Sequence, residues 1–143
     1  MFFQDLCPEL SFAPTVLHVD DNVESIDIIS RLLYAKTVWR LITSTLGVEG
    51  VEIALRLEPD LILLDLQLPD INGLEILHQL RADVRTVDTP IIMLSAEAHR
   101  NKIDECLAAG ANDYFVKPCD LHQFLGALNA FMNGDVHWTP VGV

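Results

Sequence analysis

The chain has 143 residues, half of them hydrophobic, and a mean hydropathy of +0.30, so it can bury the core of one domain and is not globally disordered. Its 21 acidic and 9 basic residues give a formal net charge of −12 at pH 7, which argues against direct binding to nucleic acid because the phosphates would be repelled. No apolar run approaches the roughly 18 residues of a membrane span, and the first residues lack the pattern of a signal peptide. We therefore expect a soluble, cytoplasmic protein that makes no membrane contact.

Short apolar runs alternate with amphipathic segments along the chain. The first strand is expected at residues 16–19, followed by a helix with Asn22 as its N-cap. A less regular strand follows at residues 39–44, and the next helix, with the stripe Val48, Val51 and Leu55, ends at Pro59. The remaining strands are expected at 61–64, 91–94 and 114–116. A helix is expected after each of them, and Asp120 is the N-cap of the last helix. The apolar stripes of these three helices are, in order, Leu74, Leu77 and Leu80; Ile103 and Leu107; and Leu121, Phe124, Leu125, Leu128 and Met132.

Five strand–helix units in strict alternation predict an α/β fold with a five-stranded parallel sheet, doubly wound, and five helices. We place this domain at residues 14–132, with an N-terminal tail at 1–13 and a C-terminal tail at 133–143, because neither end could bury a core. The run Leu61-Ile62-Leu63-Leu64 is apolar throughout, as expected of a strand covered on both faces. Right-handed crossovers bring the carboxyl ends of all strands to one edge, where sites form in such sheets.

Polar residues follow four of the predicted strands at that edge. Asp20 and Asp21 follow the first strand, Asp65 the third, Ser95 the fourth and Lys117 the fifth. Three carboxylates at close range need a counter-ion, and Mg²⁺ prefers one or two carboxylates together with water and phosphate oxygens. The lysine adds a point charge suited to a phosphoryl group.

These residue types support the transfer of a phosphoryl group to a carboxylate. Asp65 would be the nucleophile, Mg²⁺ and Lys117 would neutralise the charge on the phosphoryl oxygens, and Ser95 would donate a hydrogen bond to the new group. Each residue alone has a structural alternative, since Asp65 or Ser95 could cap the following helix, Asp20-Asp21 could be a solvated turn, and Lys117 an exposed loop lysine. The joint pattern favours the functional interpretation, because four strands end in the residue types that one reaction needs.

Four motifs occur in order along the chain: Val19-Asp20-Asp21-Asn22, Leu64-Asp65-Leu66-Gln67-Leu68-Pro69-Asp70-Ile71-Asn72-Gly73, Met93-Leu94-Ser95-Ala96 and Tyr114-Phe115-Val116-Lys117-Pro118. Through these motifs the sequence resembles, over residues 14–132, the receiver domains of two-component response regulators. The resemblance implies the flavodoxin-like strand order 2-1-3-4-5, and an acidic pair, Asp20 and Asp21, that binds Mg²⁺ with Asp21 as the direct ligand.

The resemblance also implies a role for residues around Asp65. The backbone carbonyl of Gln67 would complete the Mg²⁺ coordination, and the side chains of Gln67 and Glu97 would tune how long the phosphate survives. Ser95 takes the position of a switch hydroxyl and Tyr114 that of a switch aromatic. On phosphorylation Ser95 would move to the phosphoryl group and Tyr114 would rotate inward, changing a protein-interaction face.

By the same resemblance, the phosphoryl donor would be a histidine kinase or a histidine phosphotransfer protein, and the output would pass to a downstream protein target. The chain would catalyse only its own phosphorylation and dephosphorylation. A stand-alone regulator and a receiver excised from a hybrid histidine kinase both remain open, as does a homodimer.

Three other classes of protein share parts of this pattern. A non-phosphorylated interaction module with the same fold is the main alternative, although the acid, hydroxyl and lysine positions are all filled. A phosphatase with an aspartyl nucleophile would need an acid two residues after it, where this chain has Gln67. A flavin-binding protein would need a Ser/Thr/Gly-rich loop after its first strand, where this chain has Asp20-Asp21-Asn22-Val23.

Overall fold

The computed structural model describes residues 13–133. Apart from residues 13 and 133, the two expected tails lie outside the described part, so the domain bounds of 14–132 stay a prediction. Cys7 lies outside it as well, whereas Cys106 and Cys119 are free thiols. None of the described helices is both long and apolar enough to cross a membrane.

The predicted α/β architecture is confirmed. Five parallel strands form one sheet in the order β2-β1-β3-β4-β5, and five helices lie between and after them in the described residues. The strands are β1 (Thr15–Val19), β2 (Arg40–Ser44), β3 (Leu61–Leu64), β4 (Ile91–Ser95) and β5 (Asp113–Val116), and the helices are α2 (Val23–Lys36), α3 (Gly47–Leu57), α4 (Gly73–Ala82), α5 (Arg100–Ala108) and α6 (Leu121–Met132).

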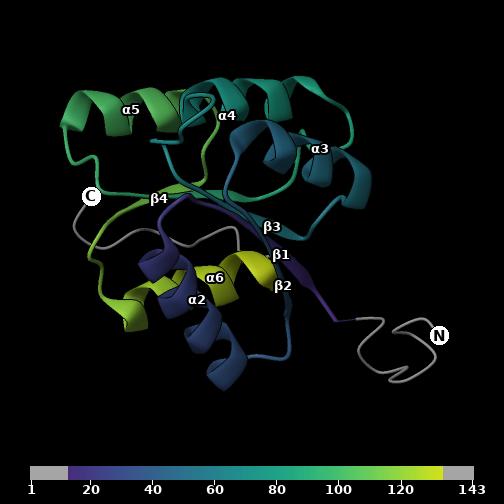
Figure 1. Ribbon diagram of the computed structural model, residues 1–143, viewed down its shortest axis with the longest axis vertical. Helices are drawn as coiled ribbons and strands as arrows, with labels where there is room; N and C mark the ends of the chain where they lie inside the picture. Colours follow the sequence, from purple (N-terminus) through teal and green to yellow (C-terminus); the bar gives the residue numbers. More distant parts are fainter. Residues whose placement is uncertain (1–12, 134–143) are drawn as a thin grey trace.

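Helices cover both faces of the sheet. Figure 1 shows α3, α4 and α5 on one face and α2 and α6 on the other. Each face has its own apolar core, and β3 contributes to both: Ile62 and Leu64 pack under α3, α4 and α5, whereas Leu61 and Leu63 pack against α2 and α6. All four side chains have no exposed surface, which confirms a strand covered on both sides.

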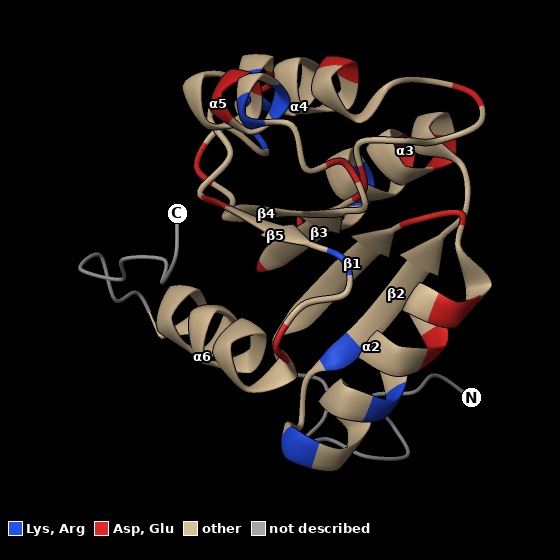
Figure 2. Ribbon diagram, turned by 90° about the vertical axis from the view of Figure 1, so that its left-hand side faces the viewer, with Lys and Arg blue, Asp and Glu red and all other residues tan. Residues whose placement is uncertain are grey.

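Local caps define where the helices begin. Asn22 accepts a hydrogen bond from the Ser25 N–H at 2.9 Å, and Asp120 accepts one from the Gln123 N–H at 3.0 Å, so both predicted N-caps are confirmed. Helix α2 also carries an acidic residue in its first turn and a basic residue in its last turn (Figure 2), which complements the dipole of the helix.

Helix α3 packs on the sheet through small residues, which corrects one expectation. Val48 was expected in the buried stripe but is exposed. The side facing the sheet includes Gly50, whose position would place a Cβ only 2.8 Å from the Val19 side chain. Val48 lies two residues from Gly50, about 200° around the helix, so it points away from the sheet. The helix has no side-chain cap of its own; instead Asp70 accepts hydrogen bonds from the N–H groups of residues 47 and 48.

Candidate functional site

The register of the parallel strands brings the residues after them to one edge. Val19 pairs with Leu64 across β1 and β3, and the Asp65 N–H donates to the Val19 carbonyl at 2.9 Å. Along the same edge, between the ends of β4 and β5, the Lys117 N–H donates to the Ser95 carbonyl at 2.8 Å. Backbone hydrogen bonds therefore extend the ladder into the very residues that were expected to form a site.

Lys117 connects two of the three carboxylates. Its Nζ atom donates to Asp20 Oδ2 at 2.7 Å and to Asp65 Oδ2 at 3.1 Å. The Asp20 side chain is fully buried, and those of Asp65 and Lys117 are 7% and 19% exposed. Lys117 is thus a largely buried counter-ion and not a free loop lysine.

The carboxylates form a cluster that suits a divalent cation. Asp20, Asp21 and Asp65 each offer an oxygen atom, and these atoms lie within 4.8 Å of one another. Asp21 is the exposed member of the group. Hard oxygen ligands at this spacing, in an open position, fit Mg²⁺, which keeps several waters and takes few protein ligands.

The two buried carboxyl groups have opposite tendencies to ionise. Burial raises the pKa of Asp65, and the charge of Asp20 adds to this, against the opposing effects of the Gln67 N–H and of Lys117. Burial also acts on Asp20, but the neighbouring His18 and Lys117 side chains and the Asn22 N–H outweigh it and hold the pKa of Asp20 well below its usual range. Asp20 is therefore the permanently charged partner of Lys117.

The structural alternatives for these residues are not borne out. The N-caps of α2, α4, α5 and α6 are Asn22, Asn72, His99 and Asp120, so Asp20, Asp65 and Ser95 cap no helix. Instead, Asp20 Oδ1 accepts the Asn22 N–H at 2.9 Å, and Asp65 Oδ1 accepts the Gln67 N–H at 3.1 Å. These short-range bonds fix the directions of the two carboxylates.

Ser95 and Tyr114 lie on the adjacent strands β4 and β5, two register positions apart. Ser95 is fully buried, and its Oγ accepts the Glu97 N–H at 3.3 Å. The Tyr114 hydroxyl donates to the Glu97 carbonyl at 2.7 Å, and burial raises the pKa of Tyr114 to about 12. Tyr114 therefore occupies the inward position that was expected only after phosphorylation.

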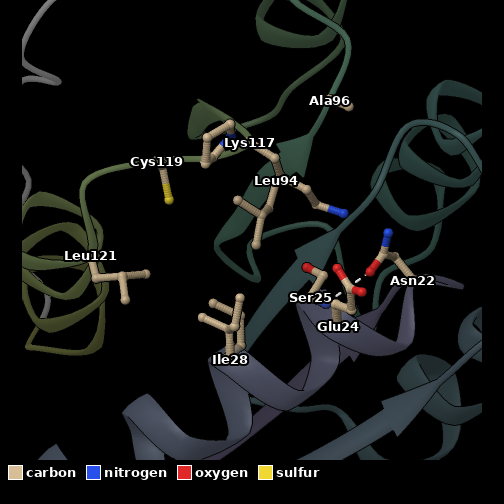
Figure 3. A pocket seen from close by; sticks show the side chains of 11 residues that line it. Asn22, Glu24, Ser25, Ile28, Leu94, Ala96, Lys117, Cys119 and Leu121 are labelled. Atoms are coloured by element: carbon tan, nitrogen blue, oxygen red, sulfur yellow. Dashed lines mark hydrogen bonds between the residues drawn. The ribbon is translucent and has the colours of Figure 1, made fainter.

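A groove adjoins this site. It has a volume of about 450 Å³ and runs between α2 and the segment from Lys117 to Leu121. In Figure 3 the Lys117 side chain extends toward the start of α2, and the apolar side chains of Ile28, Leu94 and Leu121 surround the space beyond it. The sequence did not predict this groove, because its walls come from segments far apart in the chain.

His18 is the second feature that the sequence did not predict. It is fully buried in the core, and its Nε2 atom lies 3.3 Å from Asp20 Oδ2. The signal was available in the spacing, since residues two apart in a strand point to the same face.

Comparison with known proteins agrees with the geometry. The family model of the response regulator receiver domain matches residues 16–129. The chain is 34% identical over 119 residues to the DNA-binding dual master transcriptional regulator RpaA of Synechocystis, covering 83% of this chain and 49% of RpaA. It is 38% identical over 105 residues to hybrid signal transduction histidine kinase D of Dictyostelium discoideum, covering 73% of this chain and 7% of the kinase.

A solved structure is similar over most of its length. The receiver domain of sensor histidine kinase PA1611 from Pseudomonas aeruginosa, which has a magnesium ion coordinated in its active-site cleft, has a TM-score of 0.77 and 30% identity. The match covers 85% of this chain and 98% of that domain. By contrast, this chain spans about half or less of the length of the two curated relatives.

Proposed function

Because this chain belongs to the response regulator receiver domain family of two-component systems, we propose that Asp65 accepts a phosphoryl group and thereby switches a protein-interaction face. The observation that carries the proposal is the position of Lys117, whose ammonium lies 3.1 Å from one oxygen of Asp65 and 2.7 Å from Asp20. A cation in that place neutralises charge on a phosphoryl group attached to Asp65.

Asp65 is the nucleophile in this proposal. One of its carboxylate oxygens forms a bond to phosphorus, and the bond from phosphorus to the donor's imidazole nitrogen breaks, with the electron pair staying on that nitrogen. The Gln67 N–H and the Lys117 ammonium hold the two oxygens of Asp65 in place.

The acidic cluster would hold Mg²⁺. Asp21 is the direct ligand of the acidic pair in this proposal because it is the exposed member of the cluster. Asp65 and the backbone carbonyl of Gln67 are the other direct ligands, and Asp20 completes the acidic cluster that binds the cation. When bound, Mg²⁺ supplies positive charge that neutralises the phosphoryl oxygens during transfer.

Ser95 and Tyr114 would transmit the change. Ser95 donates its hydroxyl to the phosphoryl group and gives up its contact with the Glu97 N–H. Because the Tyr114 hydroxyl is bonded to the carbonyl of the same residue, a shift of Glu97 alters Tyr114 as well. The surface formed by α5, β5 and α6 then differs between the two states.

The donor in this proposal is a histidine kinase or a histidine phosphotransfer protein, and the groove beside Lys117 is where that protein would dock (Figure 3). The apolar side chains of this groove suit contact with a protein more than with a free anion. The relatives include both a DNA-binding regulator and a hybrid kinase, so a stand-alone regulator and a part of a hybrid kinase are both consistent with this function.

Phosphorylation by acetyl phosphate tests the function without a known kinase. In the presence of Mg²⁺, we expect the intact mass of the wild type to rise by one phosphoryl group. Asp65→Asn should gain nothing, whereas Asp88→Asn, a change at an exposed aspartate in the loop before β4, should gain as much as the wild type. Unmodified wild-type protein would favour the alternative of a non-phosphorylated interaction module.

The switch is tested by amide NMR spectra recorded before and after phosphorylation. We expect shifts across α5, β5 and α6 in the wild type and much smaller shifts in Ser95→Ala, although Asp65 is still phosphorylated. Equal shifts in both proteins would exclude Ser95 from the switch.

A further inference from the structure

His18 is a polar residue in the centre of an apolar strand. Along β1, Val16 belongs to the core under α2 and α6, and Leu17 and Val19 belong to the core of the opposite face. Strand alternation places His18 on the same face as Val16 and Asp20. Its partners across the sheet are Thr43 on β2 and Leu63 on β3.

The buried imidazole lies beside a buried carboxylate. Its Nε2 atom lies 3.3 Å from Asp20 Oδ2, and both side chains have no exposed surface. Within the described residues, neither ring nitrogen makes a hydrogen bond of standard geometry. Burying a polar ring without a partner is unfavourable, so packing alone does not explain a histidine where an aliphatic side chain would fit.

We propose that His18 is a positioning residue that holds the Asp20 carboxylate in place for Lys117 and for the metal. This inference extends the proposed function, since it concerns the same site. Asp20 Oδ1 is fixed by the Asn22 N–H at 2.9 Å, and Oδ2 is approached by Lys117 Nζ at 2.7 Å and by His18 Nε2. Mutation of a group that orients the residues of a metal site typically lowers metal affinity or activity by about 10- to 100-fold.

Removal of the His18 side chain should also affect Asp65, because Asp20 and Asp65 share hydrogen bonds with Lys117. Without His18, the Lys117 ammonium becomes the only side-chain partner of Asp20 Oδ2 and is drawn toward that oxygen. Lys117 then lies farther from Asp65, and the Asp20 carboxylate, which keeps its bonds to the Asn22 N–H and to Lys117, loses one of the groups that orient it. Both metal binding and phosphoryl transfer should weaken.

Three variants separate positioning from packing. His18→Leu removes the donor, His18→Gln keeps an amide N–H of similar reach, and Val16→Ala disturbs the same strand and the same core without touching Asp20. We expect His18→Leu to weaken Mg²⁺ affinity, measured by calorimetry, by about 10- to 100-fold and to slow phosphorylation by acetyl phosphate at saturating Mg²⁺. His18→Gln should recover most of both, and Val16→Ala should lower thermal stability but leave Mg²⁺ affinity unchanged. Unchanged affinity in His18→Leu, or equal losses in the leucine and glutamine variants, would overturn the proposal.

The wild type gives a measurement that needs neither Mg²⁺ nor phosphorylation. Two-bond ¹H–¹⁵N spectra of the histidine rings report which nitrogen carries a proton, and we expect a proton on Nε2 of His18. A ring protonated at Nδ1 alone could not donate to Asp20 and would contradict the proposal, even if every variant failed to fold. The position of the proton on the His18 ring does not depend on Asp65. A protein that cannot be phosphorylated would therefore refute the proposed function, whereas the ¹H–¹⁵N spectra would still test the role of His18.

Discussion

Lys117 Nζ and Asp65 Oδ2 lie 3.1 Å apart although 52 residues separate them in the sequence. Strand β4 lies between β3 and β5 in the sheet, so the contact spans two strand positions and depends on the length of the lysine side chain. The same ammonium reaches Asp20, which directly follows β1. One cation therefore bridges loops from opposite halves of the sheet.

Lys117→Met should slow phosphorylation more than it weakens metal binding. The change removes the cation that faces the phosphoryl group, and losing one such donor commonly slows a reaction by about 10²- to 10³-fold. Mg²⁺ affinity should hold or rise, because the carboxylates lose a competing cation. Phosphorylation rates measured over a range of Mg²⁺ concentrations check this. A rate restored to that of the wild type at saturating Mg²⁺ would contradict a direct role for the lysine.

Asp21→Ala should greatly weaken Mg²⁺ binding. Asp21 is the exposed carboxylate of the cluster, so its removal takes away a ligand with little effect on packing. Glu24→Ala is the matched control, because Glu24 is an exposed acid at the start of α2 and lies outside the cluster. Calorimetric titration should give wild-type affinity for the control alone. If both variants bind Mg²⁺ equally well, Asp21 is not a ligand.

Asp70→Asn should destabilise the protein at neutral pH but not in acid. Hydrogen bonds from the N–H groups of Val48 and Gly47 lower the pKa of Asp70 below the usual value of 3.8. The charged form therefore stabilises the fold above pH 3.8, and this contribution is lost as the pH falls through the lower pKa of the folded state. Urea unfolding at neutral pH and near pH 3 measures the difference.

The control for Asp70 is Glu52→Gln, which changes an exposed carboxylate on α3, the helix whose first N–H groups Asp70 binds. The gap in stability between wild type and Asp70→Asn should narrow in acid, whereas the control should stay close to the wild type throughout. A gap that is the same at both pH values would show that the charge of Asp70 does not stabilise α3.

Arg81→Lys should destabilise the loop between α4 and β4. A lysine cannot replace the planar guanidinium, which contacts several carbonyls at once, and we expect a loss of about 1–3 kcal/mol in the free energy of unfolding. Arg100→Lys, an exposed arginine paired with Asp104, should have no measurable effect in the same urea titration. Equal stability of the two variants would contradict this role. The acceptors of Arg81 are the carbonyls of Thr86, Val87, Thr89 and Gly110 and the side chain of Asn112.

The strands and the composition of the site could be predicted from the sequence. Apolar runs such as Leu61–Leu64 are long enough to form buried strands, and a polar residue follows them. Parallel strands bring their carboxyl ends to one edge of the sheet, whatever their separation in the chain. Asp20, Asp65 and Lys117 meet for that reason. The caps Asn22 and Asp120 were also predictable, because each bonds to a residue three positions later.

Features that depend on contacts between distant segments could not be predicted. Asp70 caps α3 from 22 and 23 residues away, and the exposure of Val48 follows from how that helix packs through Gly50. The inward position of Tyr114 depends on a bond to the Glu97 carbonyl, which no periodicity encodes. The spacing of His18 and Asp20 places both side chains on one face of the sheet, but the sequence does not show that the ring and the carboxylate are buried together.

The most direct test of the account is to locate the phosphoryl group. Treatment of the phosphorylated protein with borohydride reduces an acyl phosphate to an alcohol, so the modified aspartate becomes homoserine and can be assigned by tandem mass spectrometry. We predict homoserine at residue 65, formed only when acetyl phosphate and Mg²⁺ are both present. Homoserine at Asp20 or Asp21, or a phosphoryl group held on serine or histidine, would contradict the account.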